Sequence, residues 1–359
     1  MRKTKSGVRR SKQEAPCLGT GRNPGRASRA CPGFNFKERN STSASSMPGR
    51  ILVIRGGALG DFILTLPAIR LLGDNFRDGP LHILGYRHIA ILAEGYYADS
   101  IRSIDYGPLA GFFNPKASLD RELCDYFAGF RQIVSYIYDP DGLFEGGLRR
   151  ADAKTLISAS PKIAEGRHAA LQLAQPLERL GLKLGDPAAQ IFPSSKDLAV
   201  AEGMLSGRRR PLVAIHPGSG GERKNWPLAG WLAVQKKILE DTRIGHLLII
   251  GGESDLPQLA KMKLTVRVER QSFLENLPLP LLGAIFSQCA FFLGHDSGIS
   301  HLAAAAGTSC LLLFGPTDPQ VWCPANRGVR VLRARSGQLS DLETSTVLAR
   351  IDEFLDNGF

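Results

Sequence analysis

The loop that follows the first apolar run of the chain could supply a proton acceptor. Ile51–Ile54 are apolar, and the sequence RGGALGD follows them directly. Glycines let a backbone come close to a ligand, so Gly57 and Gly60 are expected near a bound donor or acceptor. Asp61, at the expected start of a helix, could accept a proton from an attacking hydroxyl group. The alternative is that Asp61 only caps the helix, which would stabilise it by about 1 kcal/mol.

A second glycine-rich loop could bind an anion. Residues 216–227 read HPGSGGERKNWP and follow another apolar run. Ser219 and the backbone N–H groups around Gly220 can form an anion-binding nest. Lys224 can place a positive charge on a departing diphosphate, as a metal ion would in other enzymes. The residue pattern leaves open whether His216, at the end of the apolar run, is structural or functional.

A third loop has the position and composition of a diphosphate site. Residues 290–319 form an apolar run, a polar loop, a stretch of small residues and a second apolar run, which predicts strand, loop, helix and strand. The polar loop contains Asp296, Ser297 and Gly298, and either of the first two could cap the helix. The free N–H groups of such a helix favour an anion. His301 could donate to a phosphate or tie the helix to a neighbouring loop, and the whole stretch could also be an ordinary capped helix.

The remaining polar candidates indicate neither a metal site nor a dinucleotide site. Glu253 follows an apolar run and two glycines; it could bond to ribose hydroxyls or be a solvated loop acid. The first loop is not G-x-G-x-x-G, and no Gly-Lys-Ser/Thr follows it, which disfavours a dehydrogenase or a Walker-type NTPase. The six cysteines have no metal-ligand spacing, so neither a metal nor a disulfide is expected.

Two successive series of alternating strands and helices are expected to position these loops. The expected strands are 51–54, 81–84, 101–104, 133–138, 212–215, 247–250, 266–268, 290–293, 310–314 and 329–332. Helical patterns lie between them, whereas residues 139–166 are only weakly periodic. The alternation predicts an α/β protein with two Rossmann-like domains facing a cleft.

The charge distribution separates a basic tail from a nearly neutral remainder. Residues 1–46 carry +9 of the net charge of +11 and are rich in Ser, Gly, Pro and Arg, so they are expected to be disordered. Met47 directly precedes the first strand and is the expected start of translation. We expect an N-terminal domain over 47–206, a C-terminal domain over 207–338, and a helix over 339–359 that crosses back to the first domain. The neutral remainder gives no reason to expect a nucleic-acid partner.

Three stretches together resemble glycosyltransferase family 9, the ADP-heptose:lipopolysaccharide heptosyltransferases. They are ILVIRGGALGDFILTLPAIRLL, IHPGSGGERKNWP and LGHDSGISHLAAAAGTSCLLLFGPTDP. The resemblance implies a GT-B fold and inverting, metal-independent transfer with no cofactor. Asp61 matches the family's proposed catalytic base, and Lys224 matches the lysine at the donor phosphates. The donor loop is matched by Asp296, Ser297, Gly298 and His301. Glu253, in a separate loop, is a weaker match, and His295 stands where a smaller or apolar residue is expected.

The resemblance also implies the substrates. The donor would be ADP-heptose or a similar nucleotide sugar, and the acceptor a lipopolysaccharide core or related lipid-linked glycan. Three alternatives are a family member with another donor sugar, a nucleotide-sugar-binding protein without catalysis, and a nucleic-acid-associated protein that uses the basic tail. A cytoplasmic location is expected. Contact with a lipid-linked acceptor would place the protein at the inner face of the inner membrane, although the sequence has no evident anchor.

Overall fold

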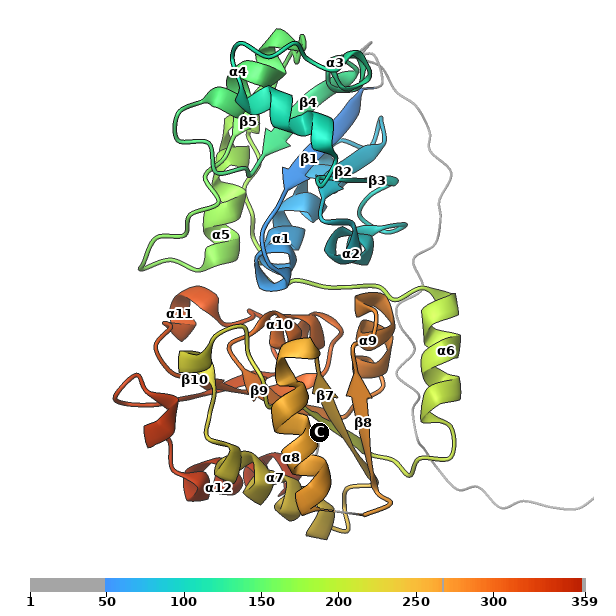
Figure 1. Ribbon diagram of the computed structural model, residues 1–359, viewed down its shortest axis with the longest axis vertical. Helices are drawn as coiled ribbons and strands as arrows, with labels where there is room; N and C mark the ends of the chain where they lie inside the picture. The colour runs from blue at the N-terminus through green and yellow to red at the C-terminus, as the bar shows by residue number, and fades with distance from the viewer. Residues whose placement is uncertain (1–48, 267, 357–359) are drawn as a thin grey trace, which may run out of the picture. The chain divides into compact units, whose positions relative to one another are not determined.

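The computed structural model describes residues 49–266 and 268–356, which form two parallel sheets covered by helices (Figure 1). The predicted disordered tail and the predicted start at Met47 lie outside these residues. Both sheets were expected from the alternation of apolar runs and helical patterns, and the α/β class with two Rossmann-like halves is confirmed.

The first sheet has the strand order β3-β2-β1-β4-β5. In its central strand, residues 51–54 are buried aliphatic side chains because neighbouring strands flank them and helices cover both faces. The elements of this half are β1 (Arg50–Arg55), α1 (Leu59–Asn75), β2 (Leu81–Gly85), α2 (Arg87–Ala90), β3 (Ser100–Ser103), α3 (Arg121–Ala128), β4 (Phe130–Ser135), α4 (Leu143–Arg150), β5 (Leu156–Ser158) and α5 (Ala169–Ala174).

The second sheet has the strand order β11-β10-β9-β6-β7-β8, again all parallel. The elements from the connection onward are α6 (Ser195–Leu205), β6 (Leu212–Ile215), α7 (Leu228–Glu240), β7 (His246–Gly251), α8 (Leu256–Thr265), β8 (Gln271–Glu275), α9 (Leu279–Phe286), β9 (Phe291–His295), α10 (Gly298–Ala305), β10 (Ser309–Phe314), α11 (Pro319–Trp322), β11 (Val329–Arg333) and α12 (Thr344–Asp356).

Several elements differ from those expected. Residues 139–166 contain α4 and β5, which the sequence pattern did not reveal because two glycines interrupt the helix and the strand has only three residues. The prediction of a strand at 266–268 is wrong for Val266 and Val268, which lie in no strand, and residue 267 lies outside the described residues. β8 lies at Gln271–Glu275. It is an edge strand that pairs only with β7, so most of its side chains are half-buried and its sequence needs no apolar run. The strand expected over 133–138 ends at Ser135, so Ile137 and Tyr138 belong to the loop that follows it.

Two helices do not pack against the domain in which the sequence pattern placed them. α6 was expected in the N-terminal domain, yet it packs against α9 of the second half, which places the crossing of the chain before α6. The last helix was expected to cross back to the first domain. Instead, α12 packs against α7, and its Phe354 ring lies 4.7 Å from that of Phe291 in β9. Apolar residues of α12 thus complete the core of the second sheet.

None of the helices within 49–266 and 268–356 has both the length and the apolar character that crossing a membrane requires.

Candidate functional site

Asp61 is the third residue of α1, and its carboxylate is partly accessible. Ala58 occupies the N-cap position, and its N–H donates to Asp61 Oδ2 over 3.1 Å. Asp61 therefore does not occupy the N-cap, although its side chain satisfies a backbone donor at the helix start. Its side chain is 37% exposed, so part of it is accessible to solvent. Gly57 has φ +98°, and a Cβ there would lie 3.2 Å from Asp61 Oδ2, so this loop requires glycine.

The buried Arg55 contacts the helix turn that carries Asp61 and stabilises it. Its Nε donates to Thr65 Oγ1 over 3.0 Å, and its Nη2 donates to the Asp61 carbonyl over 3.3 Å and lies 3.8 Å from Asp61 Oδ1. Burial lowers the pKa of Arg55, and the Asp61 carboxylate opposes this. Sequence reasoning did not single out Arg55. Its position at the end of a buried strand nevertheless indicated a role, because a buried charge must find partners.

The helix start that carries Asp61 abuts the start of α10. A Cβ at Gly298 would lie 2.8 Å from Leu59 Cβ and 3.0 Å from the backbone N of Gly60. A Cβ at Gly60 would in turn lie 3.5 Å from His301 Cδ2. The glycines predicted to lie near a ligand thus let two helix N-termini from different halves of the chain meet.

Lys224 and Asp296 form an ion pair beside this junction. Lys224 Nζ donates to Asp296 Oδ2 over 2.6 Å, and Thr317 Oγ1 donates to the same oxygen over 2.7 Å. Asp296 is buried, whereas the Lys224 side chain is 35% exposed. Ser297, and not Asp296, caps α10 by accepting the N–H of Ser300. Thr317 was missed, because nothing in its local sequence marks it as a partner of the loop.

His301 lies buried in the first turns of α10, among the charged groups of the site. Burial lowers its pKa to about 4, although the Asp296 and Asp61 carboxylates raise it. At neutral pH the ring is therefore uncharged and can donate one hydrogen bond and accept another. No hydrogen bond between described residues engages this ring.

His295 fixes the ends of the glycine-rich loop 216–227. Its Nδ1 lies 3.0 Å from the Gly218 carbonyl, and its Nε2 accepts the Trp226 N–H over 2.9 Å. Nδ1 must therefore carry the proton. Burial lowers the pKa of His295 to about 4. Ser219 Oγ donates to the Gly221 carbonyl over 2.8 Å within the same loop, and Gly220 is exposed at its tip.

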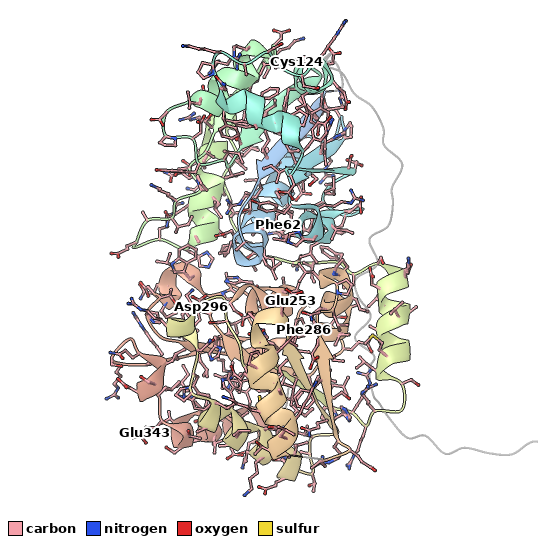
Figure 2. The ribbon with its side chains drawn as sticks, in the orientation of Figure 1. Phe62, Cys124, Glu253, Phe286, Asp296 and Glu343 are labelled. Atoms are coloured by element: carbon pink, nitrogen blue, oxygen red, sulfur yellow. The ribbon has the colours of Figure 1, made fainter. Side chains whose placement is uncertain are left out.

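A pocket of about 300 Å³ lies at the carboxyl ends of β6 and β7. Glu253 lines it and, like Asp296, follows the carboxyl end of a strand (Figure 2). His216 also lines it, and its Nε2 lies 3.2 Å from Asp255 Oδ2. Burial would raise the pKa of Asp255, but hydrogen bonds from His216 and from the Gly252 N–H outweigh it and lower the pKa. Asp255 was not recognised from the sequence.

The described residues contain no group of three or more His, Cys, Asp or Glu side chains that could hold a metal ion.

Comparisons with known proteins place the chain among sugar-transferring enzymes. A model of glycosyltransferase family 9 (heptosyltransferase) matches residues 157–351, more than half of the chain. Lipopolysaccharide heptosyltransferase 1 of Escherichia coli O18:K1:H7 is 31% identical over 343 residues, which are 85% of this chain and 97% of the relative. Lipopolysaccharide heptosyltransferase 2 of Salmonella typhimurium is 26% identical over 156 residues, 42% of this chain. That match spans only 44% of the relative's length.

Solved structures agree on the fold. The glycosyl transferase family 9 protein from Veillonella parvula superposes with a TM-score of 0.73 at 18% identity, covering 86% of this chain and 98% of that one. E. coli heptosyltransferase WaaC with ADP gives a TM-score of 0.63 at 17% identity, covering 85% of this chain and 99% of that one.

Proposed function

Since the chain belongs to glycosyltransferase family 9, we propose that it transfers a sugar from a nucleoside-diphosphate donor to a lipopolysaccharide core or related glycan. We further propose heptose as the sugar and ADP-heptose as the donor. The heptosyltransferase description of the matching family supports the sugar, and the similar fold crystallised with ADP supports the nucleotide. The observation that carries the proposal is the contact of Leu59 and Gly60 with Gly298, because it brings a carboxylate and an anion-binding helix start together.

The proposed reaction is an inverting displacement without a metal. Asp61 accepts the proton of an acceptor hydroxyl while the hydroxyl oxygen forms a bond to the anomeric carbon of the donor. The bond between that carbon and the diphosphate oxygen breaks, and ADP departs with the electron pair. Arg55 positions the Asp61 turn through its contacts with the Asp61 carbonyl and Thr65.

Three groups of the second half would stabilise the departing diphosphate. Lys224 supplies the positive charge, the N–H groups at the start of α10 supply an oriented partial charge, and the loop of Ser219 supplies further donors. The pocket lined by Glu253 and His216 would hold the nucleoside, with Glu253 bonded to the ribose. His301, uncharged at neutral pH, can donate to a phosphate.

The lipid-linked acceptor would bring the protein into peripheral contact with the inner face of the inner membrane, and the reaction itself would take place in the cytoplasm. The four described cysteines are free thiols, which supports a reducing compartment. Two alternatives from the sequence remain proposals: a family member with another donor sugar, and a nucleotide-sugar-binding protein without catalysis.

The substitution Asp61→Asn tests the proposed base. The amide can still accept the Ala58 N–H but cannot take a proton, so transfer should fall by roughly 10²–10⁴-fold with unchanged ADP affinity. ADP release from ADP-heptose with a panel of truncated lipopolysaccharide cores measures the rate, and calorimetry measures ADP binding.

Either of two results would contradict this role. One is full transfer activity in the Asn variant, and the other is a loss of ADP affinity that matches the loss of rate. A wild-type protein that binds ADP-heptose but transfers it to no glycan would favour the binding-protein alternative.

A further inference from the structure

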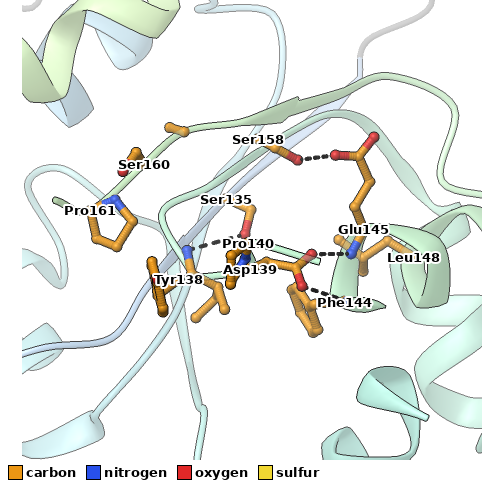
Figure 3. A pocket seen from close by; sticks show the side chains of 12 residues that line it. Ser135, Tyr138, Asp139, Pro140, Phe144, Glu145, Leu148, Ser158, Ser160 and Pro161 are labelled. Atoms are coloured by element: carbon orange, nitrogen blue, oxygen red, sulfur yellow. Dashed lines mark hydrogen bonds between the residues drawn. The ribbon is translucent and has the colours of Figure 1, made fainter. Parts of the chain in front are cut away.

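A second pocket opens at the carboxyl edge of the first sheet. It has a volume of about 220 Å³ and lies where β4 and β5 end, with Ser135 and Ser158 on its wall (Figure 3). This is below the ~300 Å³ of pockets that take drug-sized ligands, so it suits a single monosaccharide-sized group. Ile137, Phe144 and Leu148 make part of the lining apolar.

The polar side chains that line this pocket all end in oxygen. They are the hydroxyls of Ser135, Tyr138, Ser158 and Ser160 and the carboxylates of Asp139 and Glu145. Ser158 Oγ donates to Glu145 Oε2 over 2.6 Å, as the dashed line in Figure 3 marks. This bond and the pairing with Arg149 hold the pKa of Glu145 below its ordinary value, so the group is ionised at neutral pH.

Two cations contact side chains that line the pocket, and a third, Arg179, also lowers the pKa of Glu145. Arg149 Nη2 lies 2.6 Å from Glu145 Oε1. Lys162 Nζ donates to the Tyr138 hydroxyl over 2.8 Å and lies 4.2 Å from the centre of its ring. Tyr138 is nevertheless 53% exposed, so part of its ring remains free to contact a ligand.

The pocket lies one strand away from the loop of Asp61. β4 pairs with β1, and the Tyr136 N–H donates to the Ile54 carbonyl over 2.8 Å. A Cβ at Gly56 would lie 4.0 Å from Ile137 Cδ1, and Ile137 lines the pocket. Adjacent strands are about 4.8 Å apart, so a glycan lying along this sheet edge could reach both places.

We propose that this pocket is the subsite for an uncharged sugar unit of the acceptor. Serine and carboxylate oxygens can accept hydrogen bonds from sugar hydroxyls, and the apolar lining with the Tyr138 ring can contact the C–H face of a pyranose. The carboxylates of Asp139 and Glu145 repel a phosphate or carboxylate substituent. This inference rests on the proposed function, because it assumes that the ligand at this sheet edge is the acceptor.

Matched neutral and anionic glycosides test the subsite. Methyl glucoside, galactoside and mannoside are compared with the corresponding methyl uronosides, which carry a carboxylate at C6. Binding to the full chain with ADP present is followed by ligand-observed NMR. At least one neutral glycoside should bind about tenfold or more tightly than its uronoside. Glu145→Gln should reduce this preference about tenfold, whereas Glu122→Gln, which removes an exposed charge paired with Arg102, should leave it unchanged.

The aromatic contact has its own matched pair of variants. Tyr138→Ala should abolish glycoside binding, whereas Tyr96→Ala should not, although Tyr96 is similarly exposed at 57%. Tighter binding of the uronosides, binding that Tyr138→Ala leaves intact, or binding of none of the probes by a protein that binds ADP would each overturn the subsite. Failure to bind ADP would instead contradict the proposed function itself.

Discussion

Lys224 combines a half-buried side chain with a charge that is held in place. Its ammonium is fixed 2.6 Å from the buried Asp296, so it is oriented before any donor arrives. We expect Lys224→Ala to weaken ADP binding by about 10- to 100-fold, which corresponds to the loss of one charged hydrogen bond. Lys237→Ala is the control, because its side chain is equally exposed at 34% and paired with Asp352. Calorimetric titration with ADP measures both, and unchanged affinity in Lys224→Ala would remove this residue from the site.

His216 lines the pocket that we propose for the nucleoside. Nε2–H donates to Asp255, while Nδ1 is buried and has no hydrogen-bond partner within the described residues. In the neutral ring Nδ1 is an acceptor, which a nucleotide amino or hydroxyl group can satisfy. We expect His216→Ala to reduce ADP affinity about tenfold. His246→Ala removes another buried histidine, at the start of β7, and should cost stability without changing the ADP dissociation constant. Equal losses of affinity in both variants would contradict this assignment.

For three of the candidate site residues, the sequence pattern predicted their place in the fold, and their roles stay predictions. Asp61, Lys224 and Asp296 each belong to a polar stretch that follows an apolar run, and that pattern places the stretch at the carboxyl edge of a parallel sheet. The partners that hold them were not predictable, because the contacts of Thr317 with Asp296 and of His216 with Asp255 join segments 21 and 39 residues apart. Only the packing of the sheet brings such segments together.

Among the elements, the loop 216–227 is held in its conformation by the uncharged imidazole ring of His295 in β9. His295 bonds to Gly218 and Trp226 only in its neutral form, and its pKa is lowered to about 4 from 6.5. The unfolded chain therefore binds this proton more readily than the folded chain between pH 6.5 and 4. Stability is present above this window and is lost as pH falls through it, by up to about 3 kcal/mol from this residue.

The substitution His295→Asn tests this element, because an amide has a donor and an acceptor but does not titrate. Urea unfolding of both proteins at pH 7 and at pH 4.5 gives the free energies of unfolding. We expect the free energy of unfolding to differ less between pH 7 and pH 4.5 in the variant than in the wild type. His301 has the same lowered pKa, and it contributes equally to the pH dependence of stability in both proteins. Parallel pH dependence in the two proteins would show that His295 does not carry this effect.

Helices and strands with long apolar patterns were predictable, but their partners were not. β1 and β10 lie where their apolar runs indicated. β8 was misplaced because an edge strand needs no apolar run. α6 was recognised as a helix, yet nothing in its sequence states that it packs on α9 of the other half. The same holds for α12, whose apolar side could equally have faced either sheet.

For the whole molecule, the proposed reaction depends on the distance between the starts of α1 and α10. An alanine Cβ at Gly298 would lie 2.8 Å from Leu59 Cβ and 3.0 Å from a backbone nitrogen, so one helix must move. Because a 1 Å misplacement can cost on the order of 100-fold in rate, Gly298→Ala should reduce transfer by about that factor while weakening ADP binding far less. Gly60→Ala, where the nearest atom would be 3.5 Å away, should stay close to the wild-type rate. Both rates come from ADP release under saturating donor; equal rates in the two variants would show that the junction of the two halves does not position the reacting groups.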